Sequence, residues 1–253
     1  MEGLRDRVAI VTGGGIGIGK GIVRRLADEG MRLTISASSN LSGAEALRDE
    51  LASQGTPVEI VAADLRDPDS ARAIVDRTLE AYGQIDVLVN NAGFTLDEPL
   101  LEGVTADWLD VFNINLVGMM VACQAAAPAM AARGFGRIIN ISSVHSALHM
   151  PGHAIYAATK AGINGFTRNL AIELAPDGIT CNVIAPGAIQ VEKYGDLAMD
   201  PDALGAQIPL GRVGQVGDIA GAAAFLASGD ASYISGAVLF VDGALTARMP
   251  LEL

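Results

Sequence analysis

The fold is decided by Val8-Ala-Ile-Val-Thr12, which runs directly into Gly13-Gly-Gly-Ile-Gly17-Ile-Gly19. The apolar run predicts a buried strand, and Ile18–Glu29 has the period of a helix that is closed by Gly30. Glycines permit a tight turn and the close approach of a phosphate, and the helix N-terminus offers unpaired N–H groups. The spacing T-G-x-x-x-G-x-G therefore predicts a phosphate-binding βα turn, with a glycine-rich turn that binds nothing as the alternative.

Outward from this turn, short apolar runs alternate with longer segments of helical period. The expected strands are Val8–Val11, Leu33–Ala37, Val58–Ala62, Ile85–Asn90, Arg137–Ile141, Ile179–Ile184 and Ala237–Val241. The expected helices are Ile18–Glu29, Ser42–Ser53 with Ser42 as N-cap, Pro68–Tyr82, Trp108–Ala132, Ala154–Ala175 and Val216–Ala227. This alternation predicts an α/β fold: one Rossmann-type domain over residues 1–253, with a doubly wound, parallel, seven-stranded sheet in three α/β/α layers. The irregular stretch at about 188–213 would lie beyond the carboxyl end of a strand, where it could serve as a substrate lid.

Composition excludes several classes of protein. Half of the 253 residues are hydrophobic and 18% are charged, as in a globular chain with a large core. The net charge of −12 argues against a nucleic-acid partner. Cys123 and Cys181 lie in apolar stretches without metal-ligand spacing, and we expect two reduced, buried thiols. No uninterrupted apolar run approaches about 18 residues, so we expect no membrane span and a cytoplasmic protein.

Tyr156 and Lys160 lie four residues apart on a predicted helix and therefore share a face. A free tyrosine has a pKa of about 10, and a nearby ammonium favours the phenolate and lowers that pKa. Such a tyrosine can donate a proton to a carbonyl oxygen or accept one from an alcohol. Taken alone, the Y-x-x-x-K spacing is common, and an ordinary tyrosine with a surface lysine is the simpler interpretation.

Further motifs change that balance, because five of them occur in order at compatible spacing. They are Thr12-Gly13 with Gly17 and Gly19, Asn90-Asn-Ala-Gly93, Asn113-Ile-Asn115, Ser143 thirteen residues before Tyr156 and Lys160, and Asn182-Val-Ile-Ala-Pro186-Gly187. In these residues the chain resembles the short-chain dehydrogenase/reductase family from about residue 5 to residue 245. The resemblance implies an NAD(P)-dependent oxidoreductase that acts on CH–OH groups.

The resemblance also implies residue roles. Tyr156 is expected to be the catalytic acid and base, and Lys160 to lower its pKa and hold the nicotinamide ribose. Ser143 is expected to bind the substrate oxygen, with Ser142 as the alternative.

Asn115 is expected to help hold a water that relays protons to Lys160, with Asn113 as the alternative. Asp64 matches the family's adenine contact, although a helix-capping role is the competing interpretation. The expected cofactor-binding residues are Gly13, Gly15, Ile16, Gly17, Ile18, Ser36, Ser38, Ser39, Asn40, Asp64, Leu65, Asn91, Ala92, Gly93, Tyr156, Lys160, Pro186, Gly187 and Ile189.

The end of the second strand bears on the choice of cofactor. Ala37 stands where NAD enzymes usually carry an aspartate for the ribose hydroxyls, and small polar side chains surround it. The missing carboxylate favours NADP(H). NAD(H) stays possible, because Ile16 and Ser38 replace the arginines that family members with NADP(H) usually carry. Val191 replaces a threonine that often contacts the cofactor, so a lid contact there would use the backbone only or be absent.

Candidate substrate residues are Ser143, His145, His153, Tyr156 and Tyr194. We expect no metal site, because no carboxylate neighbours the histidines in the sequence. The favoured substrate is a small carbonyl compound or secondary alcohol of the sugar or polyol kind.

Two rival functions remain open at the level of the sequence. A 3-oxoacyl-[acyl-carrier-protein] reductase is the first, weakened because Asp177 stands at a docking position that is basic in such enzymes. A non-catalytic nucleotide-binding regulatory protein is the second. The family resemblance further implies a homotetramer built on the two long helices and the C-terminal strand.

Overall fold

The computed structural model describes residues 1–192 and 200–248. Its core is a seven-stranded sheet in the order β3-β2-β1-β4-β5-β6-β9, and every neighbouring pair is parallel. The strands are β1 (Val8–Thr12), β2 (Arg32–Ala37), β3 (Val58–Ala62), β4 (Val87–Asn90), β5 (Gly136–Ile141), β6 (Ile179–Pro186) and β9 (Val238–Val241). The strand order reverses between β1 and β4, which creates the crevice where such sheets bind ligands. The predicted doubly wound fold is confirmed.

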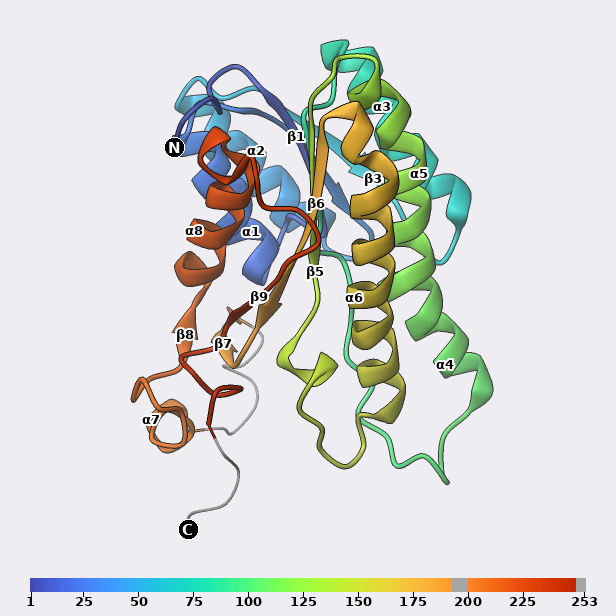
Figure 1. Ribbon diagram of the computed structural model, residues 1–253, viewed down its shortest axis with the longest axis vertical. Helices are drawn as coiled ribbons and strands as arrows, with labels where there is room; N and C mark the ends of the chain where they lie inside the picture. The colour runs from blue at the N-terminus through green and yellow to red at the C-terminus, as the bar shows by residue number, and fades with distance from the viewer. Residues whose placement is uncertain (193–199, 249–253) are drawn as a thin grey trace.

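Helices cover both faces of the sheet (Figure 1). They are α1 (Gly17–Asp28), α2 (Leu41–Ser53), α3 (Pro68–Tyr82), α4 (Thr105–Phe112), α5 (Gly118–Ala131), α6 (Ala154–Leu174), α7 (Pro201–Gly205) and α8 (Val216–Ala227). One apolar cluster packs α1, α2 and α8 on one face, and a second packs α3, α5 and α6 on the other. Along β1, Ala9 and Val11 belong to the first cluster and Ile10 to the second, which explains why this strand is apolar on both sides.

Two local predictions were wrong. The long helix begins at Thr105 rather than Trp108, and it contains a five-residue π-helix, Asn113–Val117, between α4 and α5. The N-cap of α2 is Asn40 rather than Ser42, because the Asn40 side chain accepts a hydrogen bond from the backbone N–H of Gly43 at 3.1 Å. An amide oxygen one residue before the helix reaches that N–H, whereas Ser42 already lies in the first turn.

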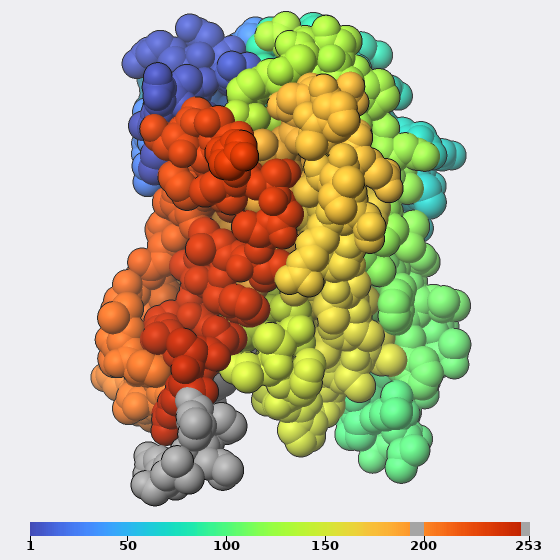
Figure 2. Space-filling model, viewed as in Figure 1, coloured from blue at the N-terminus to red at the C-terminus, as the bar shows by residue number. Residues whose placement is uncertain are grey.

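The stretch at 188–213 is more regular than the sequence suggested, where the structure describes it. It contains a short strand, β7 (Ile189–Gln190), which pairs with β8 (Gly214–Gln215), and it includes α7. These elements lie together at one end of the molecule, next to the C-terminal segment (Figure 1). On the face that Figure 2 shows, the segment around β9 (red) lies beside α6 (gold), where Gly236 approaches Ala171.

Among the described residues, one helical stretch, Thr105–Ala131, is long and apolar enough to cross a membrane by length and composition. Met119, Ala122, Cys123, Ala126 and Met130 on this stretch are buried against the sheet and α3. Its apolar character is therefore explained in part by its place in the core.

Candidate active site

The glycine turn has the geometry needed to hold a dinucleotide. Gly13 and Gly17 adopt positive φ angles of 64° and 52°, and a side chain on Gly19 would overlap the carbonyl oxygen of Gly13. Ile16, the N-cap of α1, makes no capping bond through its side chain, which leaves first-turn N–H groups facing the turn. These observations fit a cofactor pyrophosphate at the helix N-terminus.

Thr12 and Asn91 lock this turn to the neighbouring loop. The Thr12 hydroxyl accepts hydrogen bonds from the N–H groups of Asn91 and Ala92, both at 3.0 Å. In return, the Asn91 side chain donates to the carbonyls of Thr12 and Gly13 at 3.0 and 3.2 Å. The motif contains Thr12 without predicting it as a site residue, and the structure shows that its hydroxyl joins the glycine turn to the loop after β4.

The predicted cofactor-binding residues at the end of β2 differ in their exposure. Ser38 and Ser39 are exposed and open to a ligand, whereas Ser36 is buried within the sheet. Asn40 uses its side-chain oxygen as the cap of α2. Ala37 ends the strand, so no carboxylate occupies that position.

Asp64 follows β3 and is held by Arg66 through a contact of 2.6 Å. The hydrogen bonds from Arg66 lower the pKa of the Asp64 carboxyl. The helix-capping interpretation of Asp64 was wrong, because Asp67 caps α3 by accepting from the N–H of Asp69 at 3.0 Å. Leu65 beside it is buried in the core.

The segment after β6 lies against the glycine turn. Pro186 ends the strand, and Gly187 donates a backbone bond to Val241 at 3.0 Å. Ile189 is buried at 4% exposure. Val191 packs over Gly17, where an added Cβ would lie 3.4 Å from its methyl group.

Next to Val191, the carboxylate of Glu192 accepts a hydrogen bond from Lys20 of α1 at 2.9 Å. The start of the predicted lid is therefore fastened to the helix that begins at the glycine turn.

Ser142 and Ser143 point to different partners at the end of β5. The Ser142 hydroxyl donates to the carbonyl of Lys160 at 2.9 Å and is buried inside the fold. The Ser143 hydroxyl accepts from the N–H of His145 at 3.2 Å, in the first turn after the strand. This arrangement favours Ser143 over Ser142 as the group that faces a substrate.

Lys160 lies beneath Tyr156 on α6, with its Nζ atom 5.5 Å from the centre of the tyrosine ring. The ammonium donates to the carbonyl of Ile141 at 2.9 Å and is 4% exposed. Burial lowers the pKa of Lys160 to about 8. The surface-lysine interpretation is therefore excluded, since a buried cation stands next to a half-buried tyrosine.

Asn115 joins this group from the π-helix. Its side-chain oxygen accepts from the N–H of Phe94 at 2.9 Å, and its amide donates to the Phe94 carbonyl at 2.9 Å and to Thr159 at 3.3 Å. A Cβ on Gly93 would lie 2.9 Å from the Asn115 oxygen and 3.6 Å from the Lys160 nitrogen. Asn115, rather than Asn113, is thus the asparagine whose side chain ties the loop after β4 to this group.

His145 and His153 stand beside Tyr156. Their rings stack on each other at 4.9 Å, and both meet the tyrosine ring edge-on, at 5.7 and 6.3 Å between centroids. His149 is exposed. Tyr194 falls outside the described residues.

Two acidic residues near the histidines were missed by sequence reasoning. Asp97 lies 3.8 Å from Nδ1 of His153, and the N–H of Glu98 donates to the carbonyl of Gly152 at 2.9 Å. No carboxylate neighbours the histidines in the sequence, but folding brings Asp97 to His153 from a distant loop. Residues 1–192 and 200–248 still contain no cluster of three side chains that could hold a metal ion.

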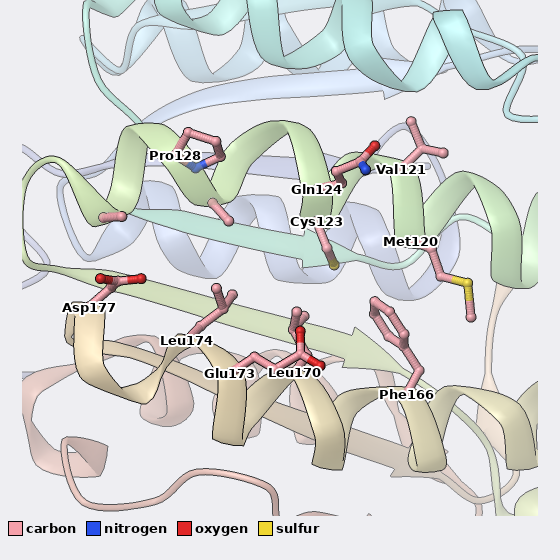
Figure 3. Close-up of a pocket in the computed structure, with 12 residues that line it drawn as sticks. Met120, Val121, Cys123, Gln124, Pro128, Phe166, Leu170, Glu173, Leu174 and Asp177 are labelled. Carbon is pink, nitrogen blue, oxygen red and sulfur yellow. The ribbon is translucent and has the colours of Figure 1, made fainter.

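A separate apolar groove lies between α5 and α6, away from the cofactor turn (Figure 3). Its volume is about 590 Å³, and Met120, Val121, Phe166 and Leu170 contribute apolar side chains. Glu173 and Asp177 lie along the α6 side of the same groove.

Comparison with known proteins agrees with this arrangement. A family model described as enoyl-(acyl carrier protein) reductase matches residues 14–246. The 3-oxoacyl-[acyl-carrier-protein] reductase of Staphylococcus aureus is 41% identical over 239 residues, which cover 94% of this chain and 97% of that protein. Among solved structures, a blue fluorescent protein from a metagenomic library in complex with NADPH is 40% identical, with a TM-score of 0.90 over 96% of this chain and 99% of that one. Acetoin dehydrogenase of Salmonella typhimurium is 34% identical, with a TM-score of 0.90 over 98% and 99%.

The parallel sheet, the glycine turn and the Tyr156–Lys160 pair define a nicotinamide-dependent oxidoreductase. The chain belongs to the short-chain dehydrogenase/reductase family, whose members are NAD(P)-dependent enzymes that act on carbonyl and CH–OH groups. The resemblance drawn from the motifs is confirmed, and the enzymatic interpretation stands over a purely regulatory one.

Proposed function

We propose that the chain reduces a small neutral carbonyl compound, or oxidises the corresponding secondary alcohol, with NADP(H) as the preferred cofactor. The observation that carries the proposal is the convergence of Ser143, Tyr156, Lys160 and Asn115 where β4 and β5 end, beside the glycine turn. Each position that the chemistry needs is filled, and the cationic group is buried beside the tyrosine.

In the direction of reduction, the bound nicotinamide supplies the hydride. Tyr156 donates the accompanying proton to the substrate oxygen, and the Ser143 hydroxyl donates a hydrogen bond to the same oxygen as negative charge develops there. The Lys160 ammonium stabilises the phenolate that Tyr156 becomes, because an opposite charge nearby favours the ionised form. In the oxidative direction the same phenolate accepts the alcohol proton.

Proton supply after the reaction would run through a water beside Asn115. Its side chain is occupied by Phe94 and Thr159, so the amide holds the loop and does not itself carry protons. A π-helix widens the turn and shifts the carbonyl partners, and such turns are frequent at functional sites. A water held by the backbone there would pass protons toward Lys160.

The preference for NADP(H) rests on the end of β2. Ala37 offers no carboxylate that would repel a 2′-phosphate, and the hydroxyls of Ser38 and Ser39 are exposed beside it. The relative solved with NADPH, at 40% identity, supports the same choice. Steady-state kinetics with NADPH and NADH would test it, and a strong preference for NADH would refute it.

The choice of a small neutral substrate rests on charge. The chain carries a net charge of −12, so an acidic carrier protein would be repelled. The similarity to acetoin dehydrogenase supports a small hydroxylated substrate. The second candidate, reduction of a 3-oxoacyl-[acyl-carrier-protein], is favoured by the 41% identity to the staphylococcal enzyme.

A substrate panel separates the two candidates. Purified protein would be assayed with small ketones, sugars and polyols, and with an acyl-carrier substrate, each with both cofactors. Turnover of the acyl-carrier substrate and of none of the small compounds would overturn our preference. The Tyr156→Phe variant should lose turnover while it binds NADPH normally, as followed by the fluorescence of the reduced cofactor.

We further propose that the chain forms a homotetramer and works in the cytoplasm, with residues at about 188–213 as a lid over the substrate. The apolar groove between α5 and α6 (Figure 3) suits a second copy of the chain. Sedimentation of Phe166→Asp should show smaller species, whereas Glu45→Lys on exposed α2 should sediment as wild type does. A single monomeric species of the wild-type protein would refute the assembly.

A further inference from the structure

The wall of the site beside Tyr156 is built from two stacked imidazoles. The rings of His145 and His153 lie 4.9 Å apart at an interplanar angle of 12°, and both present themselves edge-on to the tyrosine ring. Most of the neighbouring loop side chains, including Leu148 and Met150, are apolar and exposed. The imidazoles are therefore a polar feature in a largely apolar rim.

Contacts from two loops fix the position of this wall. Nδ1 of His153 lies 3.2 Å from the carbonyl of Pro151 and 3.8 Å from the carboxylate of Asp97. The backbone N–H of His145 donates to the hydroxyl of Ser143 at 3.2 Å, so the ring of His145 is carried on the same turn as the oxygen-binding serine. The ring of His145 also lies 5.7 Å from the Tyr156 ring, so a substrate held by Ser143 and Tyr156 would lie beside this imidazole.

His145 has one ring nitrogen that the described fold leaves without a hydrogen bond. Its Nδ1 atom is buried and has no hydrogen-bond partner among residues 1–192 and 200–248, although the ring interacts with the backbone of Leu148. Buried polar atoms are almost always paired in folded proteins, so a nitrogen beside an active site that has no partner in the described part of the chain is a candidate for binding a ligand.

The protonation state of the His145 ring determines which chemical groups it can bind. Burial lowers the pKa of His145 and the neighbouring imidazoles of His153 and His149 lower it further, against a smaller opposing effect of a hydrogen bond with the backbone of Leu148. The ring is therefore neutral at neutral pH, with one nitrogen that donates and one that accepts. A hydroxyl group satisfies such a ring in either orientation, whereas a carboxylate or phosphate would need the protonated form.

We infer that His145 is a specificity-determining residue that binds an oxygen on the carbon adjacent to the reacting carbonyl, so that the preferred substrates are α-hydroxy ketones and vicinal diols. This inference rests on the proposed function, and it narrows the substrate class of the same site. The chemistry is unchanged: hydride reaches the carbonyl carbon, Tyr156 protonates its oxygen, and the adjacent hydroxyl is bound without being altered.

A matched pair of substrates tests the inference. 3-Hydroxy-2-butanone and 2-butanone differ by one hydroxyl, and kcat/KM for each would be measured with NADPH. Wild-type protein should prefer the hydroxy ketone, and His145→Phe, which keeps an aromatic ring but removes both nitrogens, should reduce that preference by about tenfold, the scale of one lost hydrogen bond to a substrate hydroxyl. The loss should appear in the ratio of the two kcat/KM values, because 2-butanone offers the ring no second oxygen.

Two further variants make the result decisive. His145→Gln retains a donor and an acceptor and should keep most of the preference, which a merely structural role for the ring would not explain. His149→Phe changes an exposed histidine of the same loop and should keep the wild-type ratio. NADPH binding, followed by cofactor fluorescence, verifies that each variant is folded.

The possible failures are distinguishable. An unchanged ratio in His145→Phe, or equal turnover of both ketones by the wild type, overturns the inference and leaves the proposed function intact. A wild-type protein that reduces neither ketone, and reduces an acyl-carrier substrate instead, overturns both.

Discussion

Replacing Lys160 with methionine should abolish turnover and change how the stability of the protein depends on pH. The lysine is 4% exposed, and burial lowers its pKa to about 8 from an ordinary 10.5. Each tenfold change in an acid dissociation constant corresponds to about 1.4 kcal/mol, so the folded state holds this ammonium at a cost of about 3 kcal/mol at neutral pH. Methionine has a similar length and carries no charge.

The pH window follows from which state binds more protons. Below pH 8 both the folded and the unfolded chain carry the Lys160 proton, and the full cost is present. Between pH 8 and about 10.5 the unfolded chain still holds the proton that the folded chain has released, so wild-type stability rises with pH relative to the variant. Methionine also leaves the Ile141 carbonyl without its donor, which costs about 1–3 kcal/mol at every pH and moves the whole curve by a constant.

Urea unfolding at several pH values between 7 and 10.5, at fixed protein concentration, would measure this difference through the fluorescence of Trp108. The free energy of unfolding of Lys160→Met, relative to wild type, should fall by about 3 kcal/mol across that range. The Lys20→Met variant, which removes an ammonium with 26% side-chain exposure, controls for the loss of one positive charge. A difference between Lys160→Met and wild type that stays constant with pH would refute the argument that a buried cation is retained for catalysis.

Three further predictions concern the cofactor side. Gly19→Ala should lower the melting temperature and weaken NADPH binding, because its methyl group would overlap the Gly13 carbonyl; a variant as stable as wild type in thermal unfolding would contradict the tight turn. Asn40→Ala should cost about 1 kcal/mol in urea unfolding by removing the cap of α2, with kcat unchanged, and no loss of stability would argue against the cap. Glu192→Gln should raise the dissociation constant of NADPH by no more than about fivefold in a fluorescence titration, since an exposed ion pair with Lys20 is worth about 1 kcal/mol or less. A larger effect would indicate that Glu192 organises the cofactor site itself.

The sheet and the catalytic positions could be predicted from the sequence, because both depend on regular spacing. Apolar strands alternate with helices of period 3.6, and Tyr156 and Lys160 share a face because they lie one turn apart. The family motifs then select Ser143 and Asn115 from neighbouring residues of the same type.

Features that depend on loop closure could not be predicted in this way. The stack of His145 on His153 joins positions eight residues apart through an irregular loop. Asp97, which contacts His153, lies in the loop that precedes α4 in the sequence. The π-helix around Asn115 adds no residue type that distinguishes it from an ordinary helix. The sequence predicts Asn40 as a cofactor-binding residue but not that its side-chain oxygen caps α2, because the sequence does not show whether Asn40 or Ser42 reaches the first N–H groups of the helix.

The bond from the Glu98 N–H to the Gly152 carbonyl has a consequence for protein engineering. It joins the loop after β4 to the loop before α6, and the contact between Asp97 and His153 belongs to the same interface between the two loops. A chimera that takes only one of these loops from another family member would lose the partner residues of these contacts. Substrate range in this chain should therefore be transplanted by exchanging residues 93–104 and 144–153 as one module.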